Sequence, residues 1–337
     1  MRDLYTSVVD SLETSGTGGV YVQKRIGEIS AISAYAARRV ADRLEALIIE
    51  AGAPALAGIE DWPDPQGFEV TCTPPAVSSE GGRRQVHLQL LEERYCTVFR
   101  ALCDDVSGII SDAESEKEAV HYFHQRLIRW QSFLQKHGPE GLGRNERCGL
   151  FGELYVMREV FLSRFKPLSV LQSWRGCKKA NQDFQFPDFA LEVKATRASI
   201  PDRVSVSNIQ QLDGEGMSRM ILTVVHLHEN ETAGETLPAI VDNLRSSLGE
   251  DSLNLLNEGL QEVGYLDVHR DLYMSTCYQK LQVLHFEVRE GFPRLTSAQI
   301  PDGVKKVKYD IGIDSCRPFA LEEETLLGIM SEKLADE

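Results

Sequence analysis

The sequence predicts an α/β protein built around a mixed sheet that is flanked by helices. Residues 184–193 alternate apolar and polar side chains on either side of Pro187-Asp188, which is the pattern of a β-hairpin. Residues 220–227 are predominantly apolar, as in a strand covered on both faces. Residues 150–165 are apolar around much of a helical circumference and predict a buried helix before the hairpin. The expected order from about 141 to 235 is helix, three strands, helix, strand.

Three regions follow from this core. Residues 1–140 predict a separate N-terminal α+β domain, residues 141–235 the core, and residues 236–337 a C-terminal α/β extension. In the first region, residues 30–51 are rich in Ala and Arg and predict mainly helix, with a strand at Leu47–Ile49 as the alternative. Strands are expected at 68–72 and 85–91, and helices at 93–111 and 115–137. The Gly-containing segment 138–147 predicts the linker before the core.

The remaining elements follow the hairpin. The patterns predict a short strand at 204–207, a helix from 208, helices at 237–248 and 251–263, and a strand at 278–288. A further strand is expected at 304–314, with Lys305, Lys306 and Lys308 exposed along an edge. An acidic amphipathic helix is expected at 320–335. The C-terminal third is expected either to extend the core sheet or to form a small cap over it.

Composition places the chain among ordinary globular proteins. It has 337 residues, of which 42% are hydrophobic and 26% charged. We expect no membrane span and no secretory signal, because no apolar run is long enough. The seven cysteines are scattered and form no Cys-x-x-Cys pair, which favours reduced thiols in the cytoplasm over disulfides or a zinc ribbon.

The charge distribution bears on nucleic acid as a partner. The net charge is −15, which disfavours strong non-specific DNA binding by the whole chain. Residues 141–203, however, hold eleven Lys/Arg against seven Asp/Glu, a local charge of +4 that leaves −19 for the rest. We expect a basic rim around the hairpin that contacts DNA, made by Arg175, Lys178, Lys179, Arg197 and Arg203.

The hairpin also predicts a site. A turn at Pro187-Asp188 pairs Phe186 with Phe189 and, three steps on, Asp183 with Glu192. Two carboxylates that face each other repel, so a cation is expected between them. The candidates are Mg²⁺ and Lys194, which lies on the same face two residues beyond Glu192. An acidic pair, a metal and a lysine form a constellation that cleaves phosphodiesters.

These residues resemble the Asp…(Asp/Glu)-x-Lys signature of the PD-(D/E)XK nuclease superfamily, with Asp183 rather than the literal Pro187-Asp188 as the first acid. The resemblance narrows to the bacterial "PD-(D/E)XK motif protein" family over about residues 85–320. The resemblance rests on short motifs that occur in a fixed order: Gly149–Leu154, Trp174-Arg175-Gly176, Asp183-Phe184, Glu192–Thr196, Gln211-Leu212-Asp213 and Phe292-Pro293-Arg294. The implied fold is a restriction-endonuclease-like core. The implied setting is restriction-modification or phage defence.

The resemblance and the hairpin register together imply roles. Asp183, Glu192 and the Val193 carbonyl would hold Mg²⁺, with Mn²⁺ as a substitute, and Lys194 would orient or help deprotonate the attacking water.

Two further residues are candidates. Glu153 lies on the apolar side of its helix, where either an arginine or backbone amide satisfies it or it acts as a third acid beside the pair. Gln211 resembles a motif glutamine near the water in some superfamily members, although Glu215 stands where a tyrosine is usual.

The sequence therefore predicts a Mg²⁺-dependent DNA endonuclease. A catalytically silent DNA-binding or scaffold subunit is the second hypothesis, and a different phosphodiester or nucleotide enzyme is the third. The family's genomic setting implies defence-system partners such as a helicase-like ATPase or a methyltransferase, and the sequence leaves a homodimer open.

Overall fold

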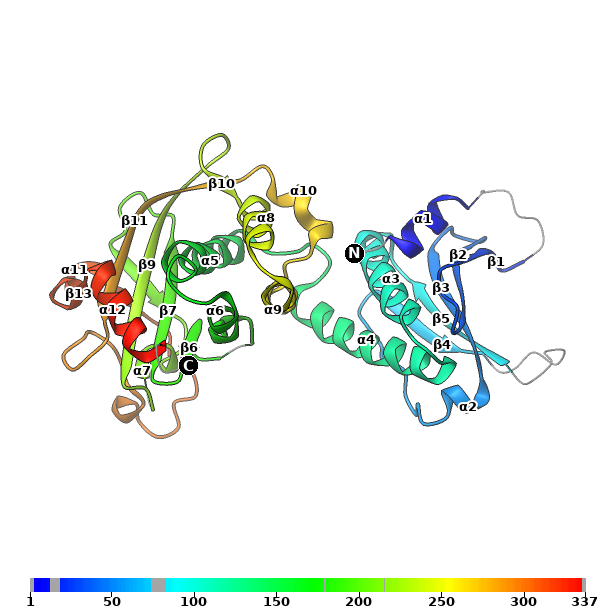
Figure 1. Cartoon of the computed structure of the whole chain (residues 1–337), viewed down its shortest axis with the longest axis horizontal. Helices are drawn as coiled ribbons and strands as arrows, with labels where there is room; N and C mark the ends of the chain where they lie inside the picture. Colours follow the sequence, from blue (N-terminus) through cyan, green and yellow to red (C-terminus); the bar gives the residue numbers. More distant parts are fainter. Residues whose placement is uncertain (1–2, 13–18, 74–82, 179, 215, 335–337) are drawn as a thin grey trace. The chain divides into compact units, whose positions relative to one another are not determined.

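The protein is described by a computed structural model that covers residues 3–12, 19–73, 83–178, 180–214 and 216–334. The chain separates into two compact units, Met1–Glu140 and Gly141–Glu337 (Figure 1). Each unit has its own sheet and is described by itself. Lys179 and Glu215, named above, lie outside the described residues, and the side chain of Lys178 does too.

The first unit is an antiparallel sheet packed against helices. The strands run in the order β1-β2-β3-β5-β4, and Phe68 of β4 packs against Phe99 of α3 with ring centroids 5.3 Å apart. Its elements are α1 (Leu4–Asp10), β1 (Tyr21–Arg25), β2 (Ser33–Arg39), β3 (Glu45–Gly52), α2 (Ala53–Leu56), β4 (Phe68–Cys72), β5 (Arg83–Leu90), a 3₁₀ turn (Glu93–Tyr95), α3 (Cys96–Ser111) and α4 (Glu116–His137).

The predicted helix over residues 30–51 is wrong. This segment forms β2 and β3, and the alternative of a strand at Leu47–Ile49 is correct. Alanine favours helix only weakly, and the sheet outweighs that preference here. Ala37 of β2 lies opposite Ala46 of β3, and both are fully buried together with Ile48. Because these side chains are small, neighbouring hydrophobic residues can pack closely over the two strands.

The second unit is built on a mixed sheet in the order β10-β11-β9-β7-β6, with β13 pairing β11. β7 and β9 are parallel and the other pairs are antiparallel. The helices are α5 (Arg144–Tyr155), a π-helix (Val156–Phe161), α6 (Pro167–Ser173), α7 (Gln210–Asp213), α8 (Leu237–Ser247), α9 (Glu250–Val263), α10 (Arg270–Tyr273), α11 (Ile313–Cys316) and α12 (Glu323–Leu334), with 3₁₀ turns at Gly176–Lys178, Asp267–His269, Ser297–Gln299 and Arg317–Phe319. The strands are β6 (Phe184–Phe186), β7 (Phe189–Thr196), β8 (Arg203–Val206), β9 (Arg219–Asn230), β10 (Glu235–Thr236), β11 (Cys277–Glu287), β12 (Tyr309–Gly312) and β13 (Ala320–Leu321).

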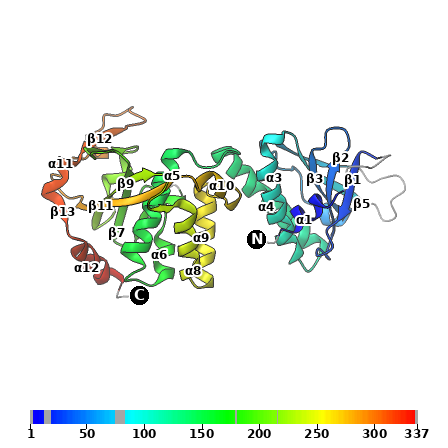
Figure 2. The same cartoon turned by 90° about the horizontal axis from the view of Figure 1, so that it is seen from above.

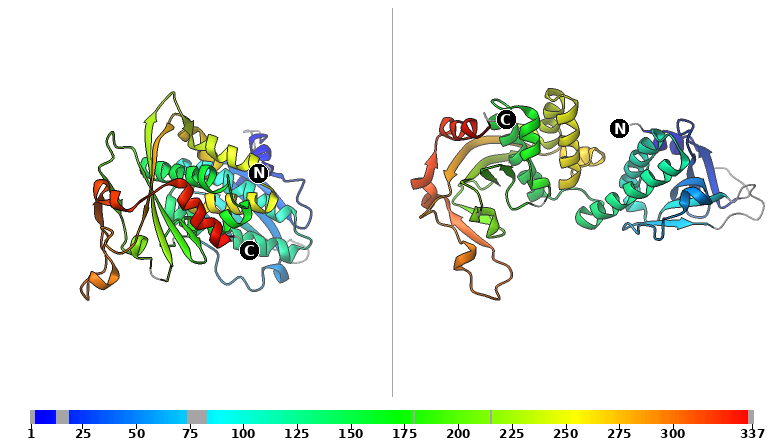
Figure 3. Two further views of the ribbon diagram at one scale, coloured as in Figure 1. Left: turned by 60° about the vertical axis from the view of Figure 1, so that its left-hand side comes forward. Right: turned by 60° about the horizontal axis from the view of Figure 1, so that its bottom comes forward.

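The two faces of this sheet have separate cores. Phe189, Leu191 and Val193 of β7 join the larger core, which α5, α6, α8 and α9 cover. Ala190 joins the smaller core on the other face, with residues of β8 and β12. Figures 2 and 3 show α5, α6, α8 and α9 on one side of the sheet and β12 on the other. The alternation predicted for the hairpin therefore has its physical basis in two cores.

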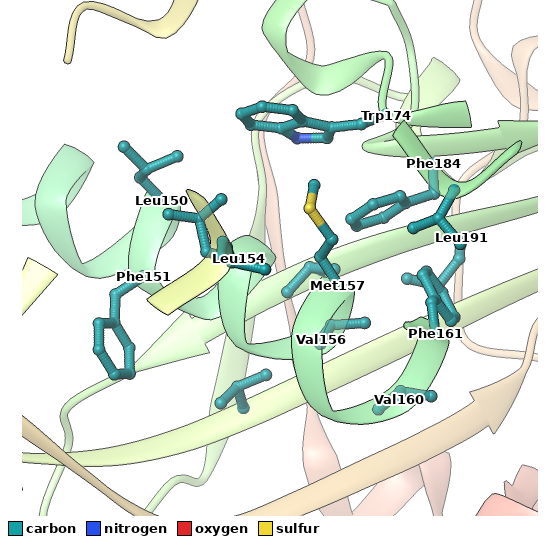
Figure 4. Packing of buried hydrophobic residues seen from close by; sticks show 14 of the residues in the cluster. Leu150, Phe151, Leu154, Val156, Met157, Val160, Phe161, Trp174, Phe184 and Leu191 are labelled. Atoms are coloured by element: carbon teal, nitrogen blue, oxygen red, sulfur yellow. The ribbon is translucent and has the colours of Figure 1, made fainter. Parts of the chain in front are cut away.

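The helix before the hairpin starts earlier than predicted. α5 begins at Arg144, inside the expected linker, and the chain continues as a π-helix to Phe161. Figure 4 shows Met157 extending from this helical segment towards Trp174, with Phe184 and Leu191 beside it. Gly152 of α5 lies against β7, where a Cβ atom would stand 2.8 Å from that of Ala195. The lack of a side chain at this glycine lets the helix approach the strand closely.

Two expectations for the C-terminal third are resolved. β11 pairs with β9, so this region extends the core sheet instead of capping it. The strand expected at 304–314 is shorter than predicted, because only Tyr309–Gly312 pairs, with β8. Lys305, Lys306 and Lys308 are exposed and precede the strand, so they do not protect a sheet edge.

Candidate active site

The hairpin has the register that the sequence predicts. Phe184 pairs with Leu191 and Phe186 with Phe189, across a turn at Pro187-Asp188. Asp183 immediately precedes β6, and its Oδ2 accepts a 2.7 Å hydrogen bond from the Val193 amide. The main-chain nitrogen of Val193 therefore donates this hydrogen bond to the Asp183 carboxylate. Asp183 is held beside Glu192 by a main-chain contact across the hairpin.

Lys194 joins Glu192 to the segment after β8. Its Nζ lies 2.7 Å from Glu192 Oε1 and donates to Gln211 Oε1 at 3.0 Å. The same Gln211 oxygen accepts a 3.0 Å hydrogen bond from the Ser207 amide. The structure therefore brings Gln211, which lies 17 residues after Lys194, into direct contact with the lysine ammonium.

Glu153 approaches the pair from α5. The indole Nε1 of Trp174 donates to Glu153 Oε2 at 2.8 Å. The sequence alternatives for satisfying this buried carboxylate were an arginine or a backbone amide, and the partner in the structure is an indole. An indole N–H is a donor without charge, so it fixes the carboxylate in place but does not neutralise it.

Gly176 allows the two carboxylates to approach each other. A Cβ atom at this position would stand 2.7 Å from Asp183 Oδ1 and 3.2 Å from Glu153 Oε2. The amides of Arg175 and Gly176 both donate to the Asp183 carbonyl, at 2.7 and 2.9 Å. The turn around Gly176 therefore positions Asp183 and leaves space between it and Glu153.

The three carboxyl groups resist ionisation. The pKa of Glu192 is raised to about 8, by burial first and by the neighbouring Asp183 second, against the effect of Lys194. Burial also raises the pKa of Asp183, although the Val193 amide and Lys194 oppose this. The pKa of Glu153 is raised by burial first and by Asp183 second. Buried groups of like charge disfavour their ionised forms, and a cation among them would reverse this.

The donor set suits a hard divalent cation. Glu192 Oε2 is buried and has no hydrogen-bond partner among the residues that the structure describes, and Asp183 and Glu192 offer the oxygen ligands that Mg²⁺ prefers. Among the described residues, no three His, Cys, Asp or Glu side chains form a ready-made metal group. The predicted set needs only two such side chains, since its third ligand is a main-chain carbonyl. The residues present therefore fit the predicted ion.

The arginines of the predicted basic rim differ in their exposure and in their contacts. Arg197 contacts Glu229 through its guanidinium and donates to Asn145 Oδ1 at 2.7 Å. Arg203 is 67% exposed and lies 3.8 Å from Asp310. Arg175 is half-buried, beside the turn that holds Asp183.

Three supporting residues were not identified from the sequence. Besides Trp174, Gln182 donates to the Gln210 carbonyl at 2.6 Å and accepts from Gln185 at 2.7 Å, which ties the hairpin to α7. Gly259 of α9 lies against Trp174, where a Cβ atom would stand 2.4 Å from the indole ring. Glycine lowers the stability of a helix interior, so its presence inside the predicted helix at 251–263 is a sequence signal that another group packs closely there.

Comparison with known proteins places the chain in a family. No curated protein and no solved structure matches it significantly. A family model described as "Putative PD-(D/E)XK family member, (DUF4420)" matches residues 7–314, which spans both units and the whole hairpin site. The chain therefore belongs to this PD-(D/E)XK family, and its α/β core is of the corresponding nuclease-like type.

Proposed function

We propose that the protein is a divalent-metal-dependent endonuclease that hydrolyses DNA phosphodiesters. The observation that carries this proposal is a cluster of three desolvated carboxylates beside one lysine, with a buried glutamate oxygen that has no partner in the described part of the chain. Structural carboxylates normally receive enough hydrogen bonds to offset their burial. A carboxylate cluster that lacks these hydrogen bonds keeps uncompensated negative charge, which a bound cation can offset.

Each residue has a role in this reaction. Asp183, Glu192 and the Val193 carbonyl would hold Mg²⁺ or Mn²⁺, which would polarise the phosphate and lower the pKa of water. Lys194 orients the attacking water and donates to a phosphate oxygen as negative charge develops. Gln211 accepts from Lys194 and limits its rotamers.

Glu153 completes the site on the α5 side. Its carboxylate is fixed by Trp174 and lies next to Asp183 around Gly176. From this position it accepts a hydrogen bond from a water at the site and keeps that water in place for attack.

DNA is the proposed substrate because the local charge around the hairpin is basic while the chain as a whole is acidic. Arg175, Arg197 and Arg203, with Lys178 and Lys179, are the proposed phosphate contacts. An acidic protein binds DNA weakly by charge alone, so we also propose a partner, of the helicase-like or methyltransferase kind, in a restriction or phage-defence system. None of the helices among the described residues is long and apolar enough to cross a membrane.

The first test is titration calorimetry of Mg²⁺ and Mn²⁺ into the wild-type chain and the Asp183→Asn variant, followed by incubation with closed circular and linear DNA. We expect metal binding that the variant loses, and cleavage of the circle that falls by about 10³-fold or more in Asp183→Asn and Lys194→Ala. Cleavage that survives both substitutions would show that the site assignment is wrong.

A silent nuclease-fold subunit is the second candidate. It is favoured by the direct Lys194–Glu192 pair, which neutralises one carboxylate without a metal. This alternative predicts no calorimetric heat with either ion, with or without a DNA oligomer. It also predicts that Lys194→Ala alters stability but no catalytic rate.

A further inference from the structure

A second polar site lies just beyond Lys194 on the same strand. A pocket of about 470 Å³ is lined by Arg144, Asn145, Cys148, Ala195, Thr196, Arg197 and Ala198. These residues come from the start of α5, the end of β7 and the two residues that follow β7. The volume is within the range of small-ligand pockets, so the space is large enough for a phosphate group and part of its sugar.

Glu229 of β9 fixes the cationic side of this pocket. Its carboxylate accepts hydrogen bonds from Arg144 Nε at 3.0 Å and from the guanidinium of Arg197. Arg197 also donates to Asn145 Oδ1. Two arginines and one glutamate leave a net positive charge. Because the glutamate is fully engaged, both arginines are held in place before any ligand arrives.

The unused groups of the pocket are donors. Among the described residues, Arg144 pairs through its Nε alone, which leaves both of its terminal nitrogens available, and its side chain is 69% exposed. Asn145 uses its oxygen and keeps its amide nitrogen, and the Thr196 hydroxyl accepts from Ala198 and can still donate. Glu146 already caps the Gly143 amide at the helix start, so the side chains supply these donors. A set of donors around an arginine fork suits a phosphate.

The pocket is placed for a phosphate that neighbours the reacting one. A strand rises about 3.3 Å per residue, so Thr196 and Arg197 stand about 7 and 10 Å beyond Lys194. Each nucleotide advances a DNA strand by about 3.4 Å along the helix axis and also turns it about that axis, so successive phosphates lie farther apart than this rise. A phosphate one or two nucleotides away is therefore within reach.

We propose that this pocket binds a phosphate group of a nucleic-acid strand whose scissile phosphate lies at Lys194. The proposal deepens the proposed nuclease function and rests on it for the identity of the strand. The pocket would hold the strand in register, so that one bond is presented to Asp183, Glu192 and Lys194.

The test measures binding without cleavage. A fluorescent DNA duplex, with either a 5′-phosphate or a 5′-hydroxyl, is titrated in EDTA over a series of salt concentrations. We expect Arg144→Ala to weaken binding about tenfold and to reduce the salt slope by about one. Arg164→Ala is the matched control, since this arginine is also exposed in the second unit and pairs with the exposed Glu324. Its affinity should stay within twofold of wild type.

A second variant covers the case in which Arg144→Ala affects folding. Asn145→Asp places an acid next to Arg197 at an exposed position, so the fold should be kept while the phosphate is repelled. Loss of affinity for both duplex ends would indicate an internal phosphate, and loss for the 5′-phosphate duplex alone would indicate a terminal one. Either result supports the pocket.

The proposal is overturned if both variants bind like Arg164→Ala, or if the wild-type chain binds neither duplex at low salt. These results are independent of the nuclease reaction. Cleavage that depends on Asp183 with unchanged binding in Arg144→Ala would refute the pocket alone. Weakened binding without any cleavage would refute the nuclease alone.

Discussion

The two units treat a buried glutamate in opposite ways. In the first, Glu45 of β3 is 5% exposed and receives hydrogen bonds from Arg100 at 2.6 and 3.1 Å and from Arg38 at 3.4 Å. In the second, Glu192 of β7 is 1% exposed and meets Lys194 through Oε1, and none of the described residues is a partner for its Oε2. The first carboxylate is satisfied by the protein itself. The second is left with part of its charge uncompensated.

This difference separates a structural ion pair from a binding site. Burying a charge costs several kcal/mol unless partners are in place, and a fold keeps an incomplete set of partners only where something else completes it. Arg38 and Arg100 complete Glu45 within the chain. A divalent cation would complete Glu192, Asp183 and Glu153.

The largest expected effect is that the same Glu→Gln substitution changes the free energy of unfolding in opposite directions at Glu45 and Glu192. Glu45→Gln should destabilise the protein by about 2–3 kcal/mol, because two partly buried arginines lose their anion. Glu192→Gln should stabilise the metal-free protein by about 2 kcal/mol at pH 9. The pKa of Glu192 is raised in the folded state, so its ionisation costs stability as pH rises through about 8. Denaturant unfolding in EDTA measures both changes.

Added Mg²⁺ sharpens this comparison. It should raise the Tm of wild type and of Glu45→Gln, and leave that of Glu192→Gln unchanged. If Glu192→Gln destabilised the metal-free chain as much as Glu45→Gln does, the two glutamates would be equivalent structural groups.

A buried base in the second unit should respond to acid. His285 of β11 contacts Thr223 Oγ1 at 2.9 Å through Nδ1, while its Nε2 has no partner among the described residues, and burial lowers its pKa to about 4. A depressed histidine pKa means that the folded state is favoured by the neutral ring. That contribution is complete above pH 6.5 and is lost as pH falls through 4, by about 3 kcal/mol. Unfolding of wild type and His285→Gln from pH 7 to 4 should show a difference of this size in pH dependence, and parallel curves would contradict it.

The position of the Glu153 carboxylate should depend on Gly259, because this glycine lies against Trp174, which donates to Glu153. Gly259→Ala would drive a methyl group into the Trp174 ring and should cost about 1–3 kcal/mol. Gly328→Ala in α12 is the matched control, because no described atom lies within 4 Å of its Cβ position outside its own helix backbone, and it should be neutral or slightly stabilising. Calorimetric Mg²⁺ affinity should fall in Gly259→Ala and stay unchanged in Gly328→Ala. Equal affinities would show that Trp174 does not position Glu153.

The smallest expected effect concerns the link from the hairpin to α7. Gln182→Leu removes the hydrogen bond to the Gln210 carbonyl and should cost about 1 kcal/mol. We expect DNA cleavage to lose kcat with little change in KM, because α7 carries the Gln211 oxygen that holds Lys194. Gln182→Glu keeps an oxygen but not the donor, so it should behave like the leucine variant. A pure KM effect would place Gln182 in substrate binding instead.

Local patterns predicted the hairpin well and the N-terminal strands poorly. The period-2 alternation of residues 184–193 and the turn at Pro187-Asp188 determine register through short-range geometry, and the observed pairs agree with it. The segment 30–51 has the composition of a helix, and its strand form depends on β1 and β5 on either side. Intrinsic helix propensity is a weak preference when neighbouring strands supply hydrogen bonds along both edges of the segment.

The sequence by itself determined that Asp183, Glu192 and Lys194 share one hairpin, since a turn and an alternation of period two leave one register that buries the apolar side chains. Only the tertiary structure decided what surrounds them. The contacts of Trp174 with Glu153, of Gly259 with Trp174 and of Gln182 with α7 join segments that are 21, 85 and 28 residues apart. No local periodicity encodes such contacts, because they depend on how helices and loops pack over the sheet.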